Sequence, residues 1–600
     1  MLRISIALAL TLATAAAAQQ TDWHAQYADI IAQKGKTADS VRMHRLFDLD
    51  WRYTNVEYPE AATSVGYPGQ NDRWTDLSLA AIDKRNRALQ DPLDVIKSID
   101  RASLSSADQL NYDLFKRNAE DAIAGVRYHG EYLAITQLGG PQSAALLLEQ
   151  NPNVTVKDYE DIIARLNGLP ATIDQTIVLL KKGLETKITP PKITLRDVPA
   201  QVKGLLTDDP MASPLLVQFT RFPQSIPAAD QKRLTAAAVK AYKEQVRPAY
   251  ERLYTFLTST YVPQSRETIG MNALPDGDSW YAYNVRTQTT TNRTPKEIHE
   301  IGLAEVKRIH GEMDSLMAAI GYKGSFADFV KFLRTDPQFY YTDSASLVRA
   351  YRDIVKRIDP ELIKMFGKLP RLPYGVTTIP SFVAKSQTTA YYQPGSPEAG
   401  RPGYYYVNTY ALDTRPKWEM EALSMHEAVP GHHLQIALSQ ELEGVPEFRR
   451  YGGYTAFVEG WALYSESLGS EMGMYQDPYS KFGQLTYDMW RAVRLVVDTG
   501  IHQFGWSRQQ AIDYFMANAA KTEHDITVEV DRYIVNPGQA LAYKSGQLEI
   551  RALRDYAQRE LGPRFDIREF HDHILGDGAL PLDVLDARIK AWVAEKKTKA

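Results

Sequence analysis

The residues best suited to chemistry form one run, His426-Glu427-Ala428-Val429-Pro430-Gly431-His432-His433. The run places metal-capable imidazoles beside a carboxylate. In the common zinc-peptidase motif H-E-x-x-H, two histidines one helical turn apart share the metal and the glutamate acts as the base. Here the fourth position after His426 is Pro430, which offers no ligand atom. The nearest candidates for a second histidine ligand are therefore His432 and His433.

A regular helix cannot bring either candidate to the same metal as His426. On such a helix the sixth position points about 120° away, and the seventh lies about 10.5 Å further along the axis. Zinc–nitrogen bonds are only about 2.0–2.1 Å long. Pro430 lacks an amide hydrogen and its ring clashes with the carbonyl of residue 426, while Gly431 relaxes the backbone at little steric cost. The pair predicts a kink or bulge that returns His432 to the usual ligand position, so we prefer His432 over His433.

A third ligand is expected downstream, because zinc hydrolases often use two histidines and one glutamate and keep a fourth position for water. Residues 454–466 form a mostly apolar pattern that carries Glu459 and Glu466. A carboxylate set among apolar side chains needs a partner, which predicts Glu459 as the third ligand. Glu466 lies seven positions later on the same helix face, where it could accept a hydrogen bond from a ligand imidazole. The alternative is that both glutamates lie on the surface.

These residues predict a hydrolytic mechanism. One zinc, held by His426, His432 and Glu459, would lower the pKa of a bound water. Glu427 would act as general base and pass the proton to the leaving amine. A second donor would stabilise the oxyanion, and the sequence offers three candidates for it: His502, Tyr533 and Tyr543. His502 could equally be a buried histidine with a structural role.

Short β-branched and aromatic runs precede the motif, at 376–379, 389–392 and 404–407. Pro and Gly separate them, which predicts a small antiparallel β-sheet at about 375–410, beside the metal-binding helix. An edge strand of such a sheet could pair with an extended peptide. Tyr406 and Asn408, in and just after the last run, are candidate substrate-binding residues, although Asn408 could instead form a turn.

Three further residues are candidates for substrate binding. Arg532 or Lys544 could hold a substrate carboxylate, since a guanidinium binds that group through two hydrogen bonds. Either could equally be a surface charge. Tyr543 completes the set of substrate-binding candidates, in addition to its candidacy as oxyanion donor.

The rest of the chain must supply the helices that position these residues. Apolar residues recur at helical spacing in 106–124, 155–187 and 228–258. Thr294-Pro295-Lys296-Glu297 is a capping box with proline at the first helical position. We expect a mainly α, two-lobed fold, with an N-terminal helical lobe at 19–290 and a catalytic lobe at 291–600.

Composition limits the class of protein. The 600 residues carry a net charge of −4, which gives no sign of a nucleic-acid partner. Residues 1–18 have one early positive charge, an apolar core and small residues, which predicts a cleaved signal peptide. The absence of cysteine removes a disulfide framework and a lipid-modified cysteine. We expect a periplasmic or secreted protein without a membrane span; the sequence carries no signal for its oligomeric state.

Several stretches of the chain resemble the bacterial domain of unknown function 885 family: 403–409, 426–435, 459–466, 497–502 and 532–540. The resemblance covers most of the mature chain and is strongest from about 375 to 550. It implies a zincin-like fold, similar in layout to the mostly helical peptidases with a glutamate as third ligand. Those peptidases place a Tyr or His far downstream as oxyanion donor, which makes Tyr533 the first choice.

The expected activity is that of an exported zinc metallopeptidase acting on short peptides, of carboxypeptidase or dipeptidase type. One alternative keeps the zinc chemistry but changes the bond, giving an amidase or other hydrolase of a non-peptide metabolite. Another is a catalytically silent periplasmic binding protein. Glu427 argues against the binding protein, because a binder needs no base beside the metal.

Overall fold

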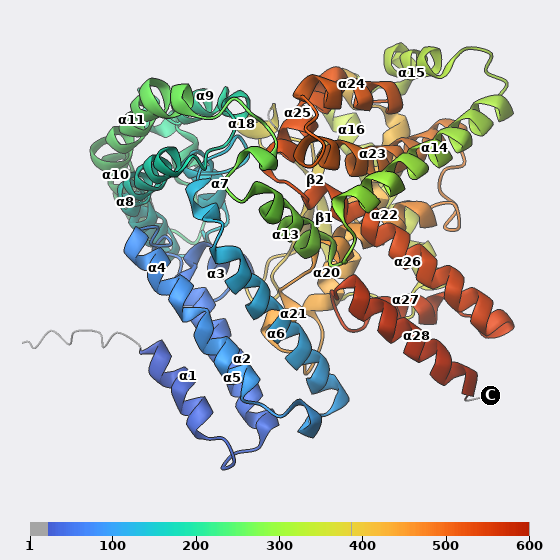
Figure 1. The fold of residues 1–600 in the computed structure, drawn as a ribbon. Coiled ribbons are helices and arrows are strands. Elements are labelled where there is room, and N and C mark those ends of the chain that lie inside the picture. The colour runs from blue at the N-terminus through green and yellow to red at the C-terminus, as the bar shows by residue number, and fades with distance from the viewer. Residues whose placement is uncertain (1–21, 386, 599–600) are drawn as a thin grey trace, which may run out of the picture.

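The computed structural model describes residues 22–385 and 387–598, so the predicted signal peptide lies outside the described residues. The described chain is mainly helical, as predicted (Figure 1), and contains a three-stranded sheet. Among its helices, none has the length and apolar character that crossing a membrane requires.

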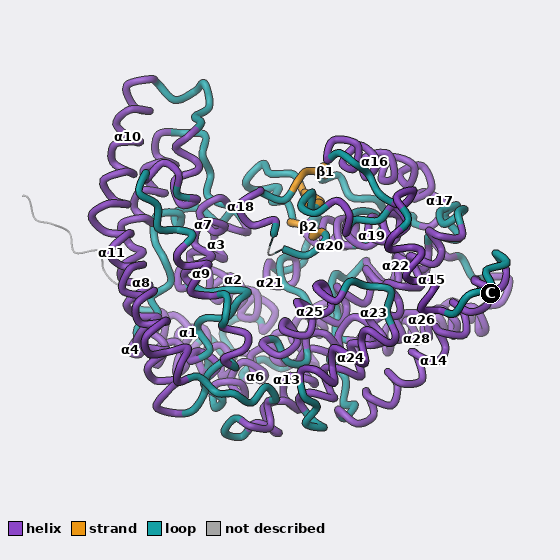
Figure 2. Tube along the Cα trace, turned by 90° about the horizontal axis from the view of Figure 1, so that it is seen from above, coloured by secondary structure: helices purple, strands orange, loops and turns teal. Residues whose placement is uncertain are grey.

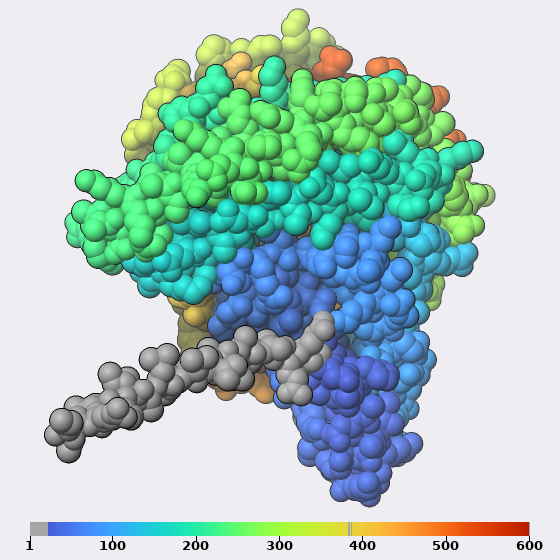
Figure 3. Space-filling view, turned by 90° about the vertical axis from the view of Figure 1, so that its left-hand side faces the viewer, coloured from blue at the N-terminus to red at the C-terminus, as the bar shows by residue number. Residues whose placement is uncertain are grey.

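The first half of the chain forms helices on one side of the molecule, from blue to green in Figures 1 and 3. An apolar core drawn entirely from residues 135–261 holds α8, α10 and α11 together, and Figure 2 shows these helices side by side. The helices are α1 (Trp23–Ala32), α2 (Asp39–Glu57), α3 (Pro59–Val65), α4 (Leu79–Ala88), α5 (Gln90–Lys97), α6 (Ser106–Val126), α7 (Ala144–Glu149), α8 (Val156–Thr186), α9 (Val198–Lys203), α10 (Ala228–Ala241), α11 (Arg247–Phe256), α12 (Val262–Gln264) and α13 (Gly277–Thr289).

The second half carries the chemical motif. Its first helix begins at the predicted capping box, in which the Thr294 hydroxyl accepts from the Glu297 amide and the Glu297 carboxylate accepts from the Thr294 amide. The helices are α14 (Pro295–Ala319), α15 (Phe326–Thr335), α16 (Ser344–Ile358), α17 (Leu362–Met365), α18 (Ser381–Ala384), α19 (Met420–Glu427), α20 (His432–Gln440), α21 (Glu447–Arg450), α22 (Thr455–Leu468), α23 (Pro478–His502), α24 (Arg508–Asn518), α25 (Glu523–Val535), α26 (Gln539–Leu561), α27 (Ile567–Leu575) and α28 (Leu582–Thr598).

Two glycines let α22 and α26 approach closely. A Cβ on Gly460 would overlap the backbone of Gly546, and a Cβ on Gly546 would overlap the carbonyl oxygen of Ala456. Because only glycine fits at such a crossing, the two backbones touch there. The contact fixes Glu459, next to Gly460, relative to Tyr543, one helical turn before Gly546.

The sheet is mixed, which corrects the prediction of an antiparallel one. Its strands are β1 (Tyr374–Thr378), β2 (Ala390–Gln393) and β3 (Gly403–Val407), in the spatial order β1-β3-β2. β3 pairs antiparallel with β2 and parallel with β1. The chain reverses at each connection, but β3 enters between the two earlier strands. Strand patterns in the sequence locate strands and do not give their spatial order.

The predicted division of the chain at residue 290 stays a prediction. One apolar cluster joins Met271 and Trp280, from the first half, to Leu495 and Leu541 from the second. The amide of Leu582 also donates to the hydroxyl of Thr290. The two halves are therefore packed together around α13.

Candidate metal centre

The helix that carries the motif is interrupted at residues 428–431. α19 ends at Glu427 and α20 begins at His432, with a cis peptide between Val429 and Pro430. The amide of His433 donates to the carbonyl of Ala428 at 3.0 Å, one residue further back than in a regular α-helix. The distortion is therefore larger than the predicted kink, because the chain leaves the helix and enters a second one.

Gly431 permits this turn. A Cβ at this position would overlap the carbonyl oxygens of Met425 and His426, so the backbone lies directly against the last turn of α19. The indole Nε1 of Trp461, from α22, donates to the carbonyl of Pro430 at 2.8 Å and holds the turn in place. As a result, the rings of His426 and His432 lie 4.8 Å apart at 87°.

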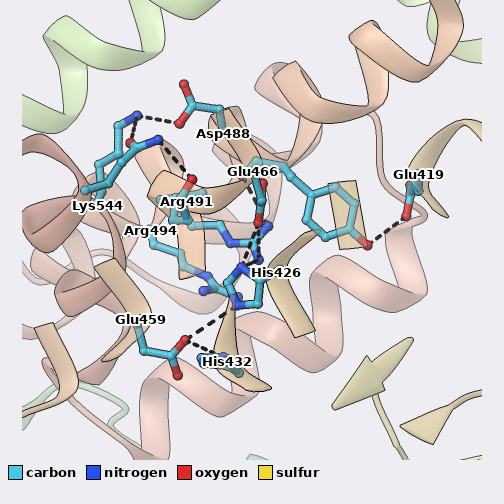
Figure 4. A network of polar contacts seen from close by, with 12 residues as sticks. Glu419, His426, His432, Glu459, Glu466, Asp488, Arg491, Arg494 and Lys544 are labelled. Atoms are coloured by element: carbon cyan, nitrogen blue, oxygen red, sulfur yellow. Dashed lines mark hydrogen bonds and ion pairs between the residues drawn. The ribbon is translucent and has the colours of Figure 1, made fainter. Parts of the chain in front are cut away.

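Three side chains converge beside this turn (Figure 4). The Nε2 atom of His426 lies 3.6 Å from Oε2 of Glu459, and Nε2 of His432 lies 3.4 Å from the same oxygen. One ligand atom from each residue lies within 4.8 Å of the other two. The structure thus brings together the three residues that the sequence predicts as ligands, from α19, α20 and α22.

The electrostatics of the cluster favour positive charge. Burial alone would lower the pKa of His426, but the neighbouring carboxylates of Glu459 and Glu466 raise it to about 9. Burial would raise the pKa of Glu459, yet His426 and His432 hold it well below its usual value. Oε2 of Glu459 is buried and has no hydrogen-bond partner of ordinary length within the described chain. Two imidazole nitrogens and a carboxylate oxygen form a donor set that suits zinc.

Glu466 orients the first of these histidines. Its carboxylate is fully buried and accepts from Nδ1 of His426 at 2.8 Å. The guanidinium of Arg491 lies 3.3 Å from the same carboxylate oxygen. When the ring is neutral and its Nδ1 proton is committed to Glu466, the lone pair of Nε2 is directed toward Glu459, as metal binding requires.

The structure leaves His433 out of the cluster. Its Nδ1 lies 2.8 Å from the hydroxyl of Tyr392, and its ring packs 4.4 Å from that of Tyr374. Burial lowers the pKa of His433 to about 4, so this ring is neutral at pH 7. The adjacent histidines therefore have different environments: His432 faces Glu459, and His433 packs between tyrosines of the sheet.

Glu427 is the last residue of α19 and is 9% exposed. Among the residues that the structure describes, none forms a hydrogen bond or ion pair with its carboxylate. A buried carboxylate without a protein partner is available to a water molecule or a substrate group.

Two of the predicted oxyanion donors are already engaged. The Tyr533 hydroxyl donates to Glu529 at 2.7 Å and accepts from Arg494 and Trp490, so its single proton is used. His502 accepts from the Met271 amide through Nδ1 and donates to the Tyr533 carbonyl through Nε2. Burial lowers the pKa of His502 to about 3. Both side chains therefore have structural partners in the core, and their assignment to catalysis stays a prediction.

Tyr543 is better placed for the same role. Its ring stacks on that of His426, with centroids 6.4 Å apart and planes 16° apart. Its hydroxyl accepts a hydrogen bond of 3.3 Å from Gln539, which leaves the hydroxyl proton free to donate. Of the three candidate donors, only Tyr543 combines contact with a predicted ligand and an uncommitted proton in the described structure.

Of the four other candidate substrate-binding residues, two have purely structural contacts. Lys544 is fully buried, and its ammonium group contacts Asp488, Gln547 and Glu305, which uses all three of its protons. Asn408 is 1% exposed, and its amide donates to the carbonyls of residues 384, 387 and 388. Neither side chain can reach a substrate without breaking these contacts, and both assignments stay predictions.

Tyr406 and Arg532 remain accessible in part. The Tyr406 ring is half-buried and stacks on that of Tyr391 at 4.9 Å, on the face of the sheet opposite the core residue Tyr405. Arg532 donates to Glu529 and to Gln539. Its guanidinium is therefore already bound to a carboxylate of the protein. Binding a substrate carboxylate, as predicted, would need N–H groups that these contacts do not use.

The sequence reasoning missed Arg491 and Arg494, two buried arginines on α23 that lie beside the cluster (Figure 4). Arg491 contacts Glu466, and Arg494 lies 4.3 Å from the centre of the Tyr543 ring. A signal for them existed in the sequence. Both interrupt an apolar run from Met489 to Val497, and the argument that singled out Glu459 applies equally to a cation among apolar residues.

Comparisons with known proteins identify the family of this chain and solved structures with a similar fold. The family described as "Bacterial protein of unknown function (DUF885)" matches residues 59–589. The fold is similar to a crystal structure titled a "putative lipoprotein" from Colwellia psychrerythraea, with a TM-score of 0.87, 27% identity, and coverage of 93% of this chain and 100% of that one. A second "putative lipoprotein", of unknown function from Shewanella oneidensis, has a TM-score of 0.67 at 18% identity over 92% of this chain and 99% of that one. No curated protein matches the chain.

Proposed function

This chain belongs to the DUF885 family of bacterial proteins of unknown function, and we propose that it is a zinc-dependent peptidase with a zincin-like catalytic centre. One observation carries the proposal: His426, His432 and Glu459 converge around a common point, and the unpaired carboxylate Glu427 is adjacent to the first of them. Two histidines, one glutamate and a neighbouring base are what metal-assisted hydrolysis of an amide requires.

The residues present fit one zinc ion. His426 and His432 would bind it through Nε2, and Glu459 through Oε2, which lacks an ordinary hydrogen bond in the described chain. Glu466 would keep His426 in the tautomer that binds metal. When bound, zinc lowers the pKa of a coordinated water toward neutrality and polarises a carbonyl oxygen.

The remaining steps belong to side chains of the protein. Glu427 accepts the proton of the attacking water and delivers it to the leaving amine. Tyr543 donates its free hydroxyl proton to the oxygen on which negative charge develops. Arg491 contacts the carboxylate of Glu466 and holds it in place beside His426.

Burial of the centre favours short substrates. His426 is 3% exposed and the Glu459 side chain 18% exposed, so a folded protein surface could not reach them. An extended peptide or a peptide end could. The predicted signal peptide and the relatives titled as lipoproteins agree with a role outside the cytoplasm, in the periplasm or in the medium.

A peptide-pool digest read by mass spectrometry tests the proposal. Purified protein with bound zinc should cleave peptides, a chelator should abolish cleavage, and added zinc should restore it. The masses of the products distinguish removal of one residue, removal of a dipeptide and internal cleavage. Cleavage that survives complete metal removal would contradict the proposal. Cleavage of non-peptide amides alone would replace it with an amidase.

A further inference from the structure

Within the described part of the chain, one buried nitrogen of Arg494 has no hydrogen-bond partner. The side chain is 6% exposed; its Nε donates to the Tyr533 hydroxyl at 2.9 Å and its Nη2 to Glu529 at 3.0 Å. Nη1 is buried, and no atom of the described residues accepts its hydrogen bonds. Because buried donors are almost always satisfied, this nitrogen marks a place for a ligand.

The local charge also favours an anion. Both Arg494 and Arg532 bond to Glu529, so two guanidinium groups share one carboxylate. The next acid along the helix, Asp531, is paired with Arg196 and Arg508. The Arg494–Arg532 pair thus shares a single directly bonded carboxylate, and a carboxylate bound at Nη1 would supply a second.

The unpaired nitrogen lies near the candidate metal centre. The guanidinium carbon of Arg494 is 4.3 Å from the centre of the Tyr543 ring, which stacks 6.4 Å from the ring of His426. Figure 4 shows Arg494 reaching from α23 toward the contact between His426 and Glu459. The guanidinium therefore lies within about 11 Å of His426, which an extended peptide spans in about three residues.

We propose that Nη1 of Arg494 binds a carboxylate of the substrate, no more than three residues from the bond that is cleaved. The inference rests on the proposed peptidase function and deepens it by naming the group that is recognised. A C-terminal carboxylate in this place makes the enzyme an exopeptidase acting at the C-terminal end of peptides. The carboxylate of an acidic substrate side chain could bind Arg494 in the same way. The experiment distinguishes this carboxylate from the C-terminal one.

The first test compares peptides with free and amidated C-termini in the zinc-loaded wild-type protein. For a peptide that the pool digest identifies, the free acid should have a kcat/KM on the order of 10- to 100-fold above that of the amide, the range expected for a charge-assisted hydrogen bond. A peptide with an aspartate side chain and an amidated C-terminus tests whether a side-chain carboxylate is recognised instead. Equal rates for all three forms would overturn the inference.

Two variants assign the preference to this residue. Arg494→Met and Arg494→Lys should raise KM for the free acid and bring its kcat/KM close to that of the amide. The lysine variant keeps the charge but loses the two contacts that Nε and Nη2 make. Arg554→Met is the control, because Arg554 pairs with Glu471; its preference for the free acid should be unchanged. A variant that is folded, binds zinc and keeps the full preference would contradict the assignment.

A binding measurement separates this inference from the proposed function. Trialanine and trialanine amide are titrated calorimetrically into Glu427→Gln protein, which retains Arg494. Tighter binding of the free acid supports carboxylate recognition even if no peptide is ever cleaved. Equal binding of the two forms overturns the inference while leaving any observed peptidase activity intact.

Discussion

The imidazole rings of His426 and His432 lie 4.8 Å apart and nearly perpendicular, although six positions separate them in the sequence. On a continuous helix the two would point in different directions. The interruption between α19 and α20, at residues 428–431, removes this obstacle. The sequence alone leaves His432 and His433 as alternatives. In the structure, His432 is the one that faces His426 and Glu459.

Replacing His432 by alanine should remove most of the bound zinc, whereas replacing His433 should not. His432 faces Glu459 at 3.4 Å, while His433 lies between Tyr374 and Tyr392. The measurement is zinc per chain after dialysis, by elemental analysis. His433→Ala is the matched control and should lower the melting temperature while keeping the metal. Loss of zinc from the His433 variant alone would reverse the assignment.

Glu466→Gln should weaken zinc binding by roughly 10- to 100-fold, the usual effect of losing the acceptor behind a metal-binding histidine. The glutamine keeps the shape of the side chain and removes the charge that faces His426. Competition with a chromophoric chelator gives the affinity. Glu471→Gln is the control, since that exposed acid pairs with Arg554. Unchanged affinity in Glu466→Gln would mean that the hydrogen bond does not orient the ligand.

Gly431→Ala should destabilise the protein by about 1–3 kcal/mol, the usual cost of overpacking. It should also reduce its zinc content. The added Cβ would overlap the carbonyls of Met425 and His426 and push His432 out of place. Gly311→Ala in α14 serves as the opposite case, because a Cβ there meets no atom within 4 Å. That variant should gain up to about 1 kcal/mol from helix propensity. Both values come from urea unfolding, and equal stability of the two variants would contradict the account of the turn.

Most of the candidate centre could be predicted from the sequence, because its signal is local. Pro430 and Gly431 lie inside the motif, and Glu459 is an isolated acid in an apolar helix. For each of these residues, the physical reason for the prediction lies in the residues next to it in the sequence. The predicted helices and the capping box at Thr294 were located for the same reason.

The sequence does not show the contacts that a side chain makes with residues far away in the chain. Tyr533 and Tyr543 look alike in sequence, but only the structure shows that Glu529 takes the proton of the first. Lys544 looks like a surface cation, but Asp488, from another helix, holds it in the core. The spatial order of the strands, with β3 in the centre, also depends on packing that no local pattern records.

The stability of the protein should fall as the pH decreases below 6.5, in part because of His571. This buried ring lies within hydrogen-bonding distance of the Met365 carbonyl and the Tyr464 hydroxyl, and burial lowers its pKa to about 3. Its contribution is therefore complete above the unfolded-state pKa of 6.5 and is lost as the pH falls toward 3. In this window His571 adds a slope of at most about 1.4 kcal/mol per pH unit.

His571→Gln tests this slope. The variant should be less stable than wild type at pH 7, and the difference should shrink as the pH falls from 6.5 to 4.5. Urea unfolding at several pH values measures both proteins under the same conditions. Parallel pH dependence in the two would show that His571 does not titrate in this way.

The central claim is that a zinc ion and Glu427 together hydrolyse peptides, and one paired measurement tests it most directly. Zinc content and peptide-pool cleavage are determined on the same samples of wild type and Glu427→Gln. We predict one zinc per chain in both proteins, with cleavage slowed by roughly 10²- to 10⁴-fold in the variant, as expected for loss of a general base. Undiminished cleavage by Glu427→Gln, or wild-type protein that cleaves peptides without zinc, would contradict the account.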